Sequence, residues 1–167
     1  MPAADAPVVD PSRERSARGP PAQVGDADAI ARLLRDFNRE FDEPAPELHQ
    51  LTERVRELLA QGEITVLLAG AGPDGIAVLR FSPEIWTRAF ECHLAELFVV
   101  PERRGQGLGR ALVVEAIELA RSKGADYMDL GTGEDDVAAR ALYESLGFSN
   151  RGGKPGGPVN FFYERKL

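Results

Sequence analysis

The chain has 167 residues, 43% of them hydrophobic, which is enough for one domain with its own core. Its formal net charge of −7 argues against a general nucleic-acid-binding protein, because such proteins present a basic surface. One cysteine and two histidines allow no intramolecular disulfide and argue against a zinc cluster.

The first 23 residues are rich in proline, alanine and charge, and they contain no apolar core typical of a secretory signal. A segment of this composition buries too little apolar surface to offset the entropy of ordering, which predicts a flexible tail over residues 1–23. We expect the folded domain over residues 24–167. No apolar run has the length that crosses a bilayer, so we expect no membrane partner and a cytoplasmic protein.

Two helices and three strands are predicted in the first hundred residues. Apolar residues recur at helical spacing within residues 26–41 and 48–59. Pro46 suits the first turn of the second helix, and Gly62 suits its end. Residues 63–71 and 76–81 are apolar runs joined by GPDG, which predicts two strands paired as a hairpin. Residues 89–100 form a third, longer strand.

The second part of the chain predicts helices over 109–124 and 134–147, with a strand over 126–132 between them. Residues 148–151 and 159–167 are predicted as two final strands, separated by the flexible segment GGKPGGP. The order is helix, helix, three strands, helix, strand, helix, two strands. It predicts an α/β fold in which helices cover a mixed sheet.

The segment VVPERRGQGLGRAL, residues 99–112, joins the third strand to the next helix through three closely spaced glycines. Such a turn lets backbone N–H groups point at an anion, and the helix start adds its positive end. A P-loop would need Gly-Lys-Ser/Thr, but Arg110 and Ala111 follow Gly109. A dinucleotide-binding fingerprint needs a small third residue, and the two possible frames place Arg110 or Leu112 there.

The remaining pattern, Arg/Gln-x-x-Gly-x-Gly/Ala, is met by Arg104, Gly107 and Gly109. Around it, LFVVPERRGQGLGRAL resembles the strand–loop–helix of the GCN5-related N-acetyltransferase (GNAT) family, and ARALYESLGF resembles that family's downstream helix. The resemblance extends from about residue 26 to the C-terminus. It implies a GNAT-like α/β (α+β) fold, with a mixed, mostly antiparallel twisted sheet and helices on both faces. It also implies acetyl-coenzyme A (acetyl-CoA) as co-substrate and no metal.

The resemblance implies that the glycine loop holds the pyrophosphate of acetyl-CoA and that the strand before it pairs with the pantetheine arm. Family members often carry an asparagine seven residues before the helix tyrosine, where this chain has Asp136. That departure weakens the expected contact, and Asp136 also suits a helix cap. The expected cofactor-binding residues are Leu97, Phe98, Val99, Arg104, Gly105, Gln106, Gly107, Leu108, Gly109, Arg110 and Asp136.

Acetyl transfer to an amine needs a base for the amine and a proton donor for the departing thiolate. Glu96, on the strand before the loop and among apolar neighbours, is the candidate base; its alternative role is to bind the substrate's ammonium. Tyr143 matches the family tyrosine near the cofactor sulfur and is the candidate donor, with ring packing as the alternative. Regular strand alternation places His93 on the face opposite Glu96, which favours a structural role for His93.

We therefore expect an acyltransferase that moves an acetyl group from acetyl-CoA to a primary amine by direct attack. An acidic chain favours a small cationic or aminoglycoside-like acceptor. Four acids between the first two helices could receive it or simply be solvated, namely Glu40, Asp42, Glu43 and Glu47. The alternatives are a non-catalytic acyl-CoA sensor, a protein N-terminal or lysine acetyltransferase, and a small nicotinamide-binding domain. Homodimerisation through the C-terminal strands is expected from family analogy only.

Overall fold

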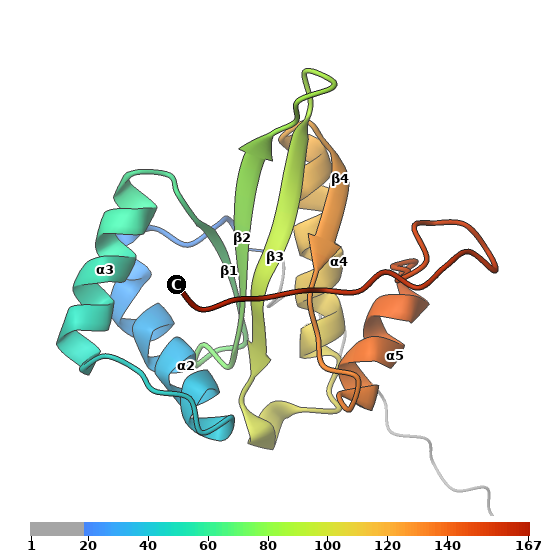
Figure 1. Cartoon of the computed structure of the whole chain (residues 1–167). Helices are drawn as coiled ribbons and strands as arrows, with labels where there is room; N and C mark the ends of the chain where they lie inside the picture. The colour runs from blue at the N-terminus through green and yellow to red at the C-terminus, as the bar shows by residue number, and fades with distance from the viewer. Residues whose placement is uncertain (1–18) are drawn as a thin grey trace, which may run out of the picture.

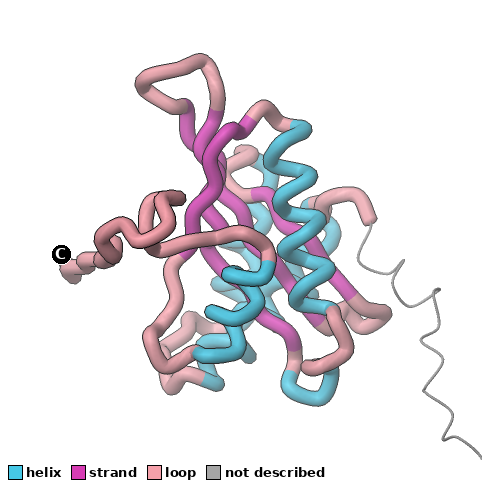
Figure 2. The backbone as a smooth tube through the Cα atoms, turned by 90° about the vertical axis from the view of Figure 1, so that its right-hand side faces the viewer, coloured by secondary structure: helices cyan, strands magenta, loops and turns pink. Residues whose placement is uncertain are grey.

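The computed structural model describes residues 19–167 as one four-stranded sheet between helices. Helices α2 and α3 lie against one face, and α4 lies behind the other (Figure 1). Figure 2 shows the same layers edge-on, with strands between helices. The helices are α2 (Ala27–Glu40), α3 (Leu48–Ala60), α4 (Leu108–Ser122) and α5 (Val137–Ser145); the strands are β1 (Thr65–Ala69), β2 (Gly75–Pro83), β3 (Phe90–Val99) and β4 (Ala125–Leu130).

The sheet has the strand order β1-β2-β3-β4 and is mostly antiparallel. β1 pairs antiparallel with β2, and β2 pairs antiparallel with β3, as the predicted hairpin requires. β3 and β4 are parallel, so a crossover must join them, and α4 makes that crossover. The expected fold class, a mixed sheet with helices on both faces, is confirmed.

Two apolar layers hold the helices to the sheet. The layer under α2 and α3 is built on alternate strand residues, among them Ile76, Val78 and Phe98. The layer under α4 uses the intervening residues, among them Leu79 and Leu94. Because strand side chains alternate between faces, each strand of the hairpin contributes to both layers.

The second helix begins later than its sequence pattern predicts. The sequence predicts Pro46 in the first helical turn, whereas α3 begins at Leu48. Pro44 and Pro46 explain the difference, because proline lacks an N–H and disfavours helical backbone in the residue before it. The end is as expected: Gly62 adopts a left-handed conformation with φ of 71° just after α3.

The two predicted C-terminal strands do not form, and that prediction was wrong. Residues 148–167 contain no strand; the two segments meet at one backbone hydrogen bond, in which Asn160 N–H donates to the Asn150 carbonyl at 2.6 Å. Phe161, Phe162 and Tyr163 are between 75% and 88% exposed. A lone two-stranded ribbon with no buried apolar face gains too little to offset its ordering entropy.

The predicted tail falls mostly outside the described residues, which begin at Gly19. Near its end, the N–H of Ala22 donates to the Val66 carbonyl of β1 at 2.8 Å. Contacts with the sheet therefore begin before residue 24. Residues 1–18 lie outside the described part, and the tail predicted there stays a prediction.

Two adjacent valines of α4 test how much the buried layer contributes to stability. Val113 is fully buried against the sheet, whereas Val114 is 37% exposed. Val113→Ala should lower the free energy of unfolding by roughly 2 kcal/mol, because it removes two buried methyl groups and leaves a cavity. Val114→Ala is the matched control and should change it by less than half as much. Urea denaturation of both variants measures the difference, and equal effects would contradict the packing of α4 described here.

Candidate active site

The central feature of the site is the point where β3 and β4 stop pairing. Their last register pair is Leu94 with Leu130, yet β3 continues to Val99. Along residues 95–99, β3 pairs with β2 on one side, and no strand of the described chain pairs with the other side (Figure 1). This free edge can bind an extended molecule through backbone hydrogen bonds, as an added strand would. The predicted residues Leu97, Phe98 and Val99 all lie on it.

The glycine loop follows this edge directly. Gly105 and Gly107 are left-handed, with φ of 71° and 83°, and Gly107 is the N-cap residue of α4. A side chain at either position would meet no atom within 4 Å, so their backbone faces open space. Gly109 differs, because a Cβ there would lie 3.8 Å from Leu142 and Val99, which indicates close packing. The first two glycines thus leave N–H groups and the positive end of α4 open to an anion.

Arg104 is held by the protein itself. Its guanidinium donates to both Glu40 carboxylate oxygens, at 2.8 and 2.6 Å, and its Nε donates to the Val99 carbonyl at 2.9 Å. The hydrogen bonds from Arg104 lower the pKa of Glu40 below its usual range. Arg104 therefore ties the end of α2 to the end of β3, which makes it a structural clamp at the loop.

The other polar side chains of the loop also have partners within the chain. Arg110 donates from Nη1 to the Ser145 hydroxyl at 2.8 Å and so joins α4 to α5. The Gln106 side-chain amide donates to the Glu102 carbonyl at 3.4 Å. The open groups nearest the loop are therefore backbone N–H groups, as a helix N-terminus provides.

Helix α5 carries the predicted Asp136 and Tyr143. The Asp136 carboxylate accepts from the Ala139 N–H at 3.0 Å and caps the helix. Tyr143 is 8% exposed, and its ring packs edge-on against Phe148 with centroids 6.0 Å apart. Burial, with a smaller contribution from Asp136, raises the pKa of Tyr143 to about 12. Its phenol therefore keeps its proton at neutral pH, as a proton donor must.

A β-bulge changes which way Glu96 and His93 point. Val78 lies opposite Glu96 but Leu79 lies opposite Leu94, so the register shifts by one residue of β3. Arg80 lies opposite His93, two positions after Val78 on the same face of β2. Glu96 and His93 therefore share one face of the sheet. The expectation of opposite faces was wrong, because it assumed a regular strand.

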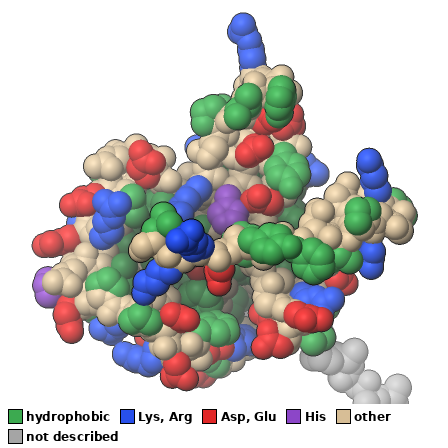
Figure 3. Space-filling view, in the orientation of Figure 1, with side chains coloured by type: hydrophobic (Ala, Val, Ile, Leu, Met, Phe, Trp, Pro, Cys, Tyr) green, Lys and Arg blue, Asp and Glu red, His purple; other side chains and the backbone are tan. Residues whose placement is uncertain are grey.

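Polar side chains gather on the face of the sheet that carries Glu96 and His93. Burial raises the pKa of Glu96 above its usual range, while the charges of Arg80 and His93 act in the opposite direction. His93 Nδ1 lies 2.6 Å from the Asp129 Oδ1 of β4. Figure 3 shows acidic, basic and histidine side chains gathered near the middle of this view. A partly buried carboxylate with a raised pKa thus lies beside charged groups on this face.

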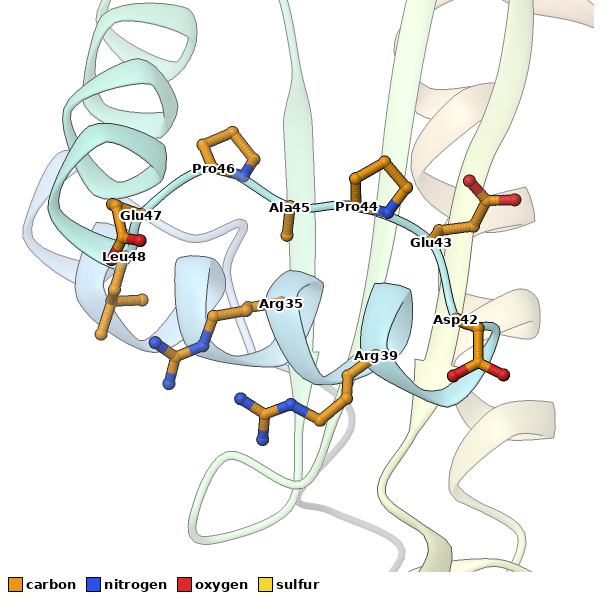
Figure 4. Close-up of a pocket in the computed structure, with 9 residues that line it drawn as sticks. All are labelled: Arg35, Arg39, Asp42, Glu43, Pro44, Ala45, Pro46, Glu47 and Leu48. Carbon is orange, nitrogen blue, oxygen red and sulfur yellow. The ribbon is translucent and has the colours of Figure 1, made fainter.

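A pocket of about 550 Å³ lies elsewhere, at the connection between α2 and α3. Arg35 and Arg39 extend to the same side beneath the connecting segment (Figure 4). The predicted acceptor acids Asp42, Glu43 and Glu47 also line it, whereas Glu40 is bound to Arg104. The pocket has mixed charge, and none of its lining residues belongs to β3, the glycine loop or α5. The full lining is Arg35, Arg39, Asp42, Glu43, Pro44, Ala45, Pro46, Glu47 and Leu48.

Residues 19–167 contain neither a membrane-spanning helix nor a metal-binding cluster. No helix in this range is long and apolar enough to cross a membrane. No group of three histidine, cysteine or carboxylate side chains is gathered there as a metal would need.

Comparison with known proteins identifies the family. Residues 28–148 match the acetyltransferase (GNAT) family. The chain belongs to this family. It is an N-acetyltransferase, similar over 129 residues to the uncharacterised N-acetyltransferase YhfO of Bacillus subtilis, at 31% identity over 76% of this chain and 86% of that protein. A second B. subtilis relative, the uncharacterised N-acetyltransferase YvbK, is 33% identical over 94 residues, which span 56% of this chain and 57% of YvbK.

Solved structures of GNAT enzymes agree with the architecture. The crystal structure of an Arthrobacter sp. FB24 protein of the acetyltransferase class superposes with a TM-score of 0.82 at 37% identity, covering 98% of this chain and all of that chain. An aminoglycoside acetyltransferase from a soil metagenome, solved with sisomicin, superposes with a TM-score of 0.67 at 19% identity, covering 87% of this chain and 94% of its own. The similarity to the aminoglycoside acetyltransferase, at 19% identity, shows a shared fold alone.

The raised pKa of Glu96 predicts a pH-dependent gain in stability when its charge is removed. At pH 7 the folded protein holds a partly desolvated carboxylate, so Glu96→Gln should raise the melting temperature. Below about pH 4.3, the pKa of a glutamate in the unfolded chain, Glu96 is protonated in both the folded and the unfolded wild type. The gain in melting temperature should then disappear. Differential scanning calorimetry from pH 4 to pH 8 measures it.

Glu91→Gln is the matched control, because Glu91 lies on the same strand but is exposed. It should leave the melting temperature nearly unchanged across this range. A melting temperature of Glu96→Gln below that of the wild type at pH 7 would contradict the environment described for Glu96.

Proposed function

We propose that this GNAT enzyme transfers the acetyl group of acetyl-CoA to a primary amine by direct attack. One observation carries the proposal: the free edge of β3 leads without interruption into the left-handed glycines and the first turn of α4. An extended amide-containing arm that ends in a pyrophosphate has the complementary chemistry, since amides pair with a strand edge and phosphates with a helix N-terminus.

The residues present fit acetyl-CoA as a co-substrate. Leu97 and Val99 direct their backbone groups away from β2 and offer hydrogen bonds to the pantetheine arm, although the Val99 carbonyl already accepts from Arg104. Gly105 and Gly107 leave room for the phosphates because side chains there would fill open space. Acetyl-CoA supplies the activated acyl group as a thioester. Arg104 contributes by holding the loop in place through Glu40 rather than by a free charge.

The proton transfers are assigned to groups of this chain. An alkyl ammonium has a pKa of about 10 and must lose a proton before it can attack. Burial raises the pKa of Glu96 toward neutral pH, and Glu96 lies on the same face of the sheet as His93. Glu96 serves as the base or as the ligand of the substrate ammonium. Tyr143 retains its phenolic proton and supplies it to the departing thiolate. A backbone N–H of the β3 edge is placed to stabilise the carbonyl oxygen.

The acceptor we propose is a small cationic amine, either a polyamine or an aminoglycoside. Support comes from the acidic side chains Glu96 and Asp129 on the open face beside the free edge of β3. The structural neighbour solved with sisomicin accepts an aminoglycoside on the same fold, which is a fold-level analogy. The acids of the α2–α3 connection sit together with Arg35 and Arg39, so they argue less for a cationic ligand.

Gly107→Ala tests the binding site of the co-substrate. Calorimetric titration of the wild type with acetyl-CoA should show one site per chain. The variant places a side chain at a φ of 83°, which should distort the loop and weaken binding at least 10-fold. Gly62→Ala is the matched control, because Gly62 is equally left-handed and open but follows α3.

The two glycine variants should lose similar stability, since each forces about 1–2 kcal/mol of backbone strain. Only Gly107→Ala should lose affinity. Absence of heat and of thermal stabilisation with the wild type would overturn the proposed co-substrate. NADH, titrated in parallel, should not bind; binding of NADH alone would favour the nicotinamide alternative.

Tyr143→Phe tests the proton donor. The ring and its packing against Phe148 are kept, while the hydroxyl is lost. With an accepted amine, thiol release should fall about 100-fold in kcat with unchanged affinity for acetyl-CoA. Tyr127→Phe is the control, because Tyr127 is 57% exposed on β4 and should retain the wild-type rate. Equal rates for Tyr143→Phe and wild type would contradict the assignment.

A further inference from the structure

The pair formed by His93 of β3 and Asp129 of β4 has no part in the mechanism above. We propose that His93 is a second acid–base group of the acceptor site, which takes the proton of the substrate ammonium, and that Asp129 positions it. The proposal rests on the proposed acetyl transfer and assigns the first deprotonation of the acceptor to His93, which leaves Glu96 as the ligand of the ammonium.

The His93–Asp129 pair lies next to the point where β3 and β4 stop pairing. His93 lies opposite Asp129, and only the next pair, Leu94 with Leu130, separates it from the free edge. The bulge in β3 brings Glu96 to the same face as His93. A base for the amine is needed next to the strand edge that would hold the thioester, and His93 has that location.

The contact with Asp129 also selects the useful form of the imidazole. A carboxylate only accepts hydrogen bonds, so the 2.6 Å contact assigns the N–H to Nδ1 in the neutral ring. Nε2 then carries a lone pair, and no described residue donates to it. An imidazole held in this tautomer accepts a proton at Nε2, and the carboxylate stabilises the imidazolium that results.

The surroundings of His93 suit proton transfer better than a purely structural role. Its side chain is 46% exposed and that of Asp129 is 53% exposed, so the pair adds little to stability. The charged and titratable groups on the same face are Arg80 of β2, Glu91 and Glu96 of β3, and Tyr127 and Asp129 of β4. The three carboxylates on this face favour a cationic substrate, and solvent contact lets the proton leave.

The proton balance of the step is complete with these groups. The ammonium gives one proton to Nε2 of His93, and the free amine attacks the thioester carbonyl carbon. The new C–N bond forms as the C–S bond breaks. The second nitrogen proton passes through water to restore the phenol of Tyr143, which has given its own proton to the thiolate, and His93 releases its proton to water. The sum is one amide, one thiol and one proton from an ammonium and a thioester.

The test compares a cationic amine, which must lose a proton before it attacks, with an amine that is already unprotonated. His93→Gln, Asp129→Asn and wild type are assayed with the best acceptor among spermidine, kanamycin and cadaverine, and with hydroxylamine, which is already unprotonated at neutral pH. His49→Gln is the matched control, because His49 is the other histidine and is exposed on α3. Acetyl-CoA binding is measured on each variant by calorimetry.

His93→Gln should lower kcat for the cationic amine about 100-fold, leave hydroxylamine turnover within about threefold, and leave acetyl-CoA affinity unchanged. Asp129→Asn should lower kcat about 10-fold and shift the acidic limb of its pH profile. In the His49→Gln background, 15N NMR of the single remaining imidazole should show the proton on Nδ1, and Asp129→Asn should change that spectrum.

A wild-type rate for His93→Gln with the cationic amine, or an equal loss with hydroxylamine, would overturn this inference while leaving the acetyl transfer intact. Failure of the wild type to acetylate any of these amines, despite binding acetyl-CoA, would instead overturn the proposed function and this assignment with it. An Nε2 proton on His93 of the neutral ring, in the spectrum of the His49→Gln protein, would also contradict the role of Asp129.

Discussion

The difference in length between β3 and β4 governs the rest of the site. β4 ends at Leu130, whereas β3 runs five residues past its last parallel pair, so half of β3 keeps an unpaired edge. A buried strand edge would normally be paired or covered, because its N–H and C=O groups need partners. Here the edge is extended into the glycine turn and α4, and the Arg104–Glu40 pair fixes the exit of the strand against α2. Unpaired backbone N–H and C=O groups therefore follow one another along the edge of β3 and the glycine turn to the N-terminus of α4.

In the proposed mechanism, the sheet separates the group that gives a proton from the groups that take one. Tyr143 belongs to the apolar layer under α4, together with Leu79 and Leu94, where burial keeps its phenol protonated. His93 and Glu96 lie on the opposite, more open face, where water and a charged amine can approach. A group that gives a proton and groups that take one can therefore hold different protonation states without sharing one dielectric environment.

Much of this arrangement follows from the sequence, and the failures have specific physical causes. Helical periodicity, the GPDG turn and the glycine spacing predict α2 to α5, the hairpin and the loop, because each depends on local patterns. The bulge at β3 depends on how β2 and β3 register, and no residue of HLAELF marks it, so the face of His93 was predicted wrongly. The partner of Arg104 lies 64 residues away, and that of His93 lies 36 residues away, beyond any local pattern. The final segment has strand-like alternation but no apolar layer to cover, and alternation alone does not form a strand.

The measurement that tests this account most directly is amide hydrogen exchange with and without acetyl-CoA. Binding along the free edge and the glycine turn should slow exchange in residues 95–99 and 105–109, because their N–H groups would gain acceptors. β1 lies on the far side of the sheet order and should exchange at the same rate in both states. Protection confined to other segments, with residues 95–109 unchanged at saturating acetyl-CoA, would contradict the claim that the separation of β3 from β4 creates the binding site.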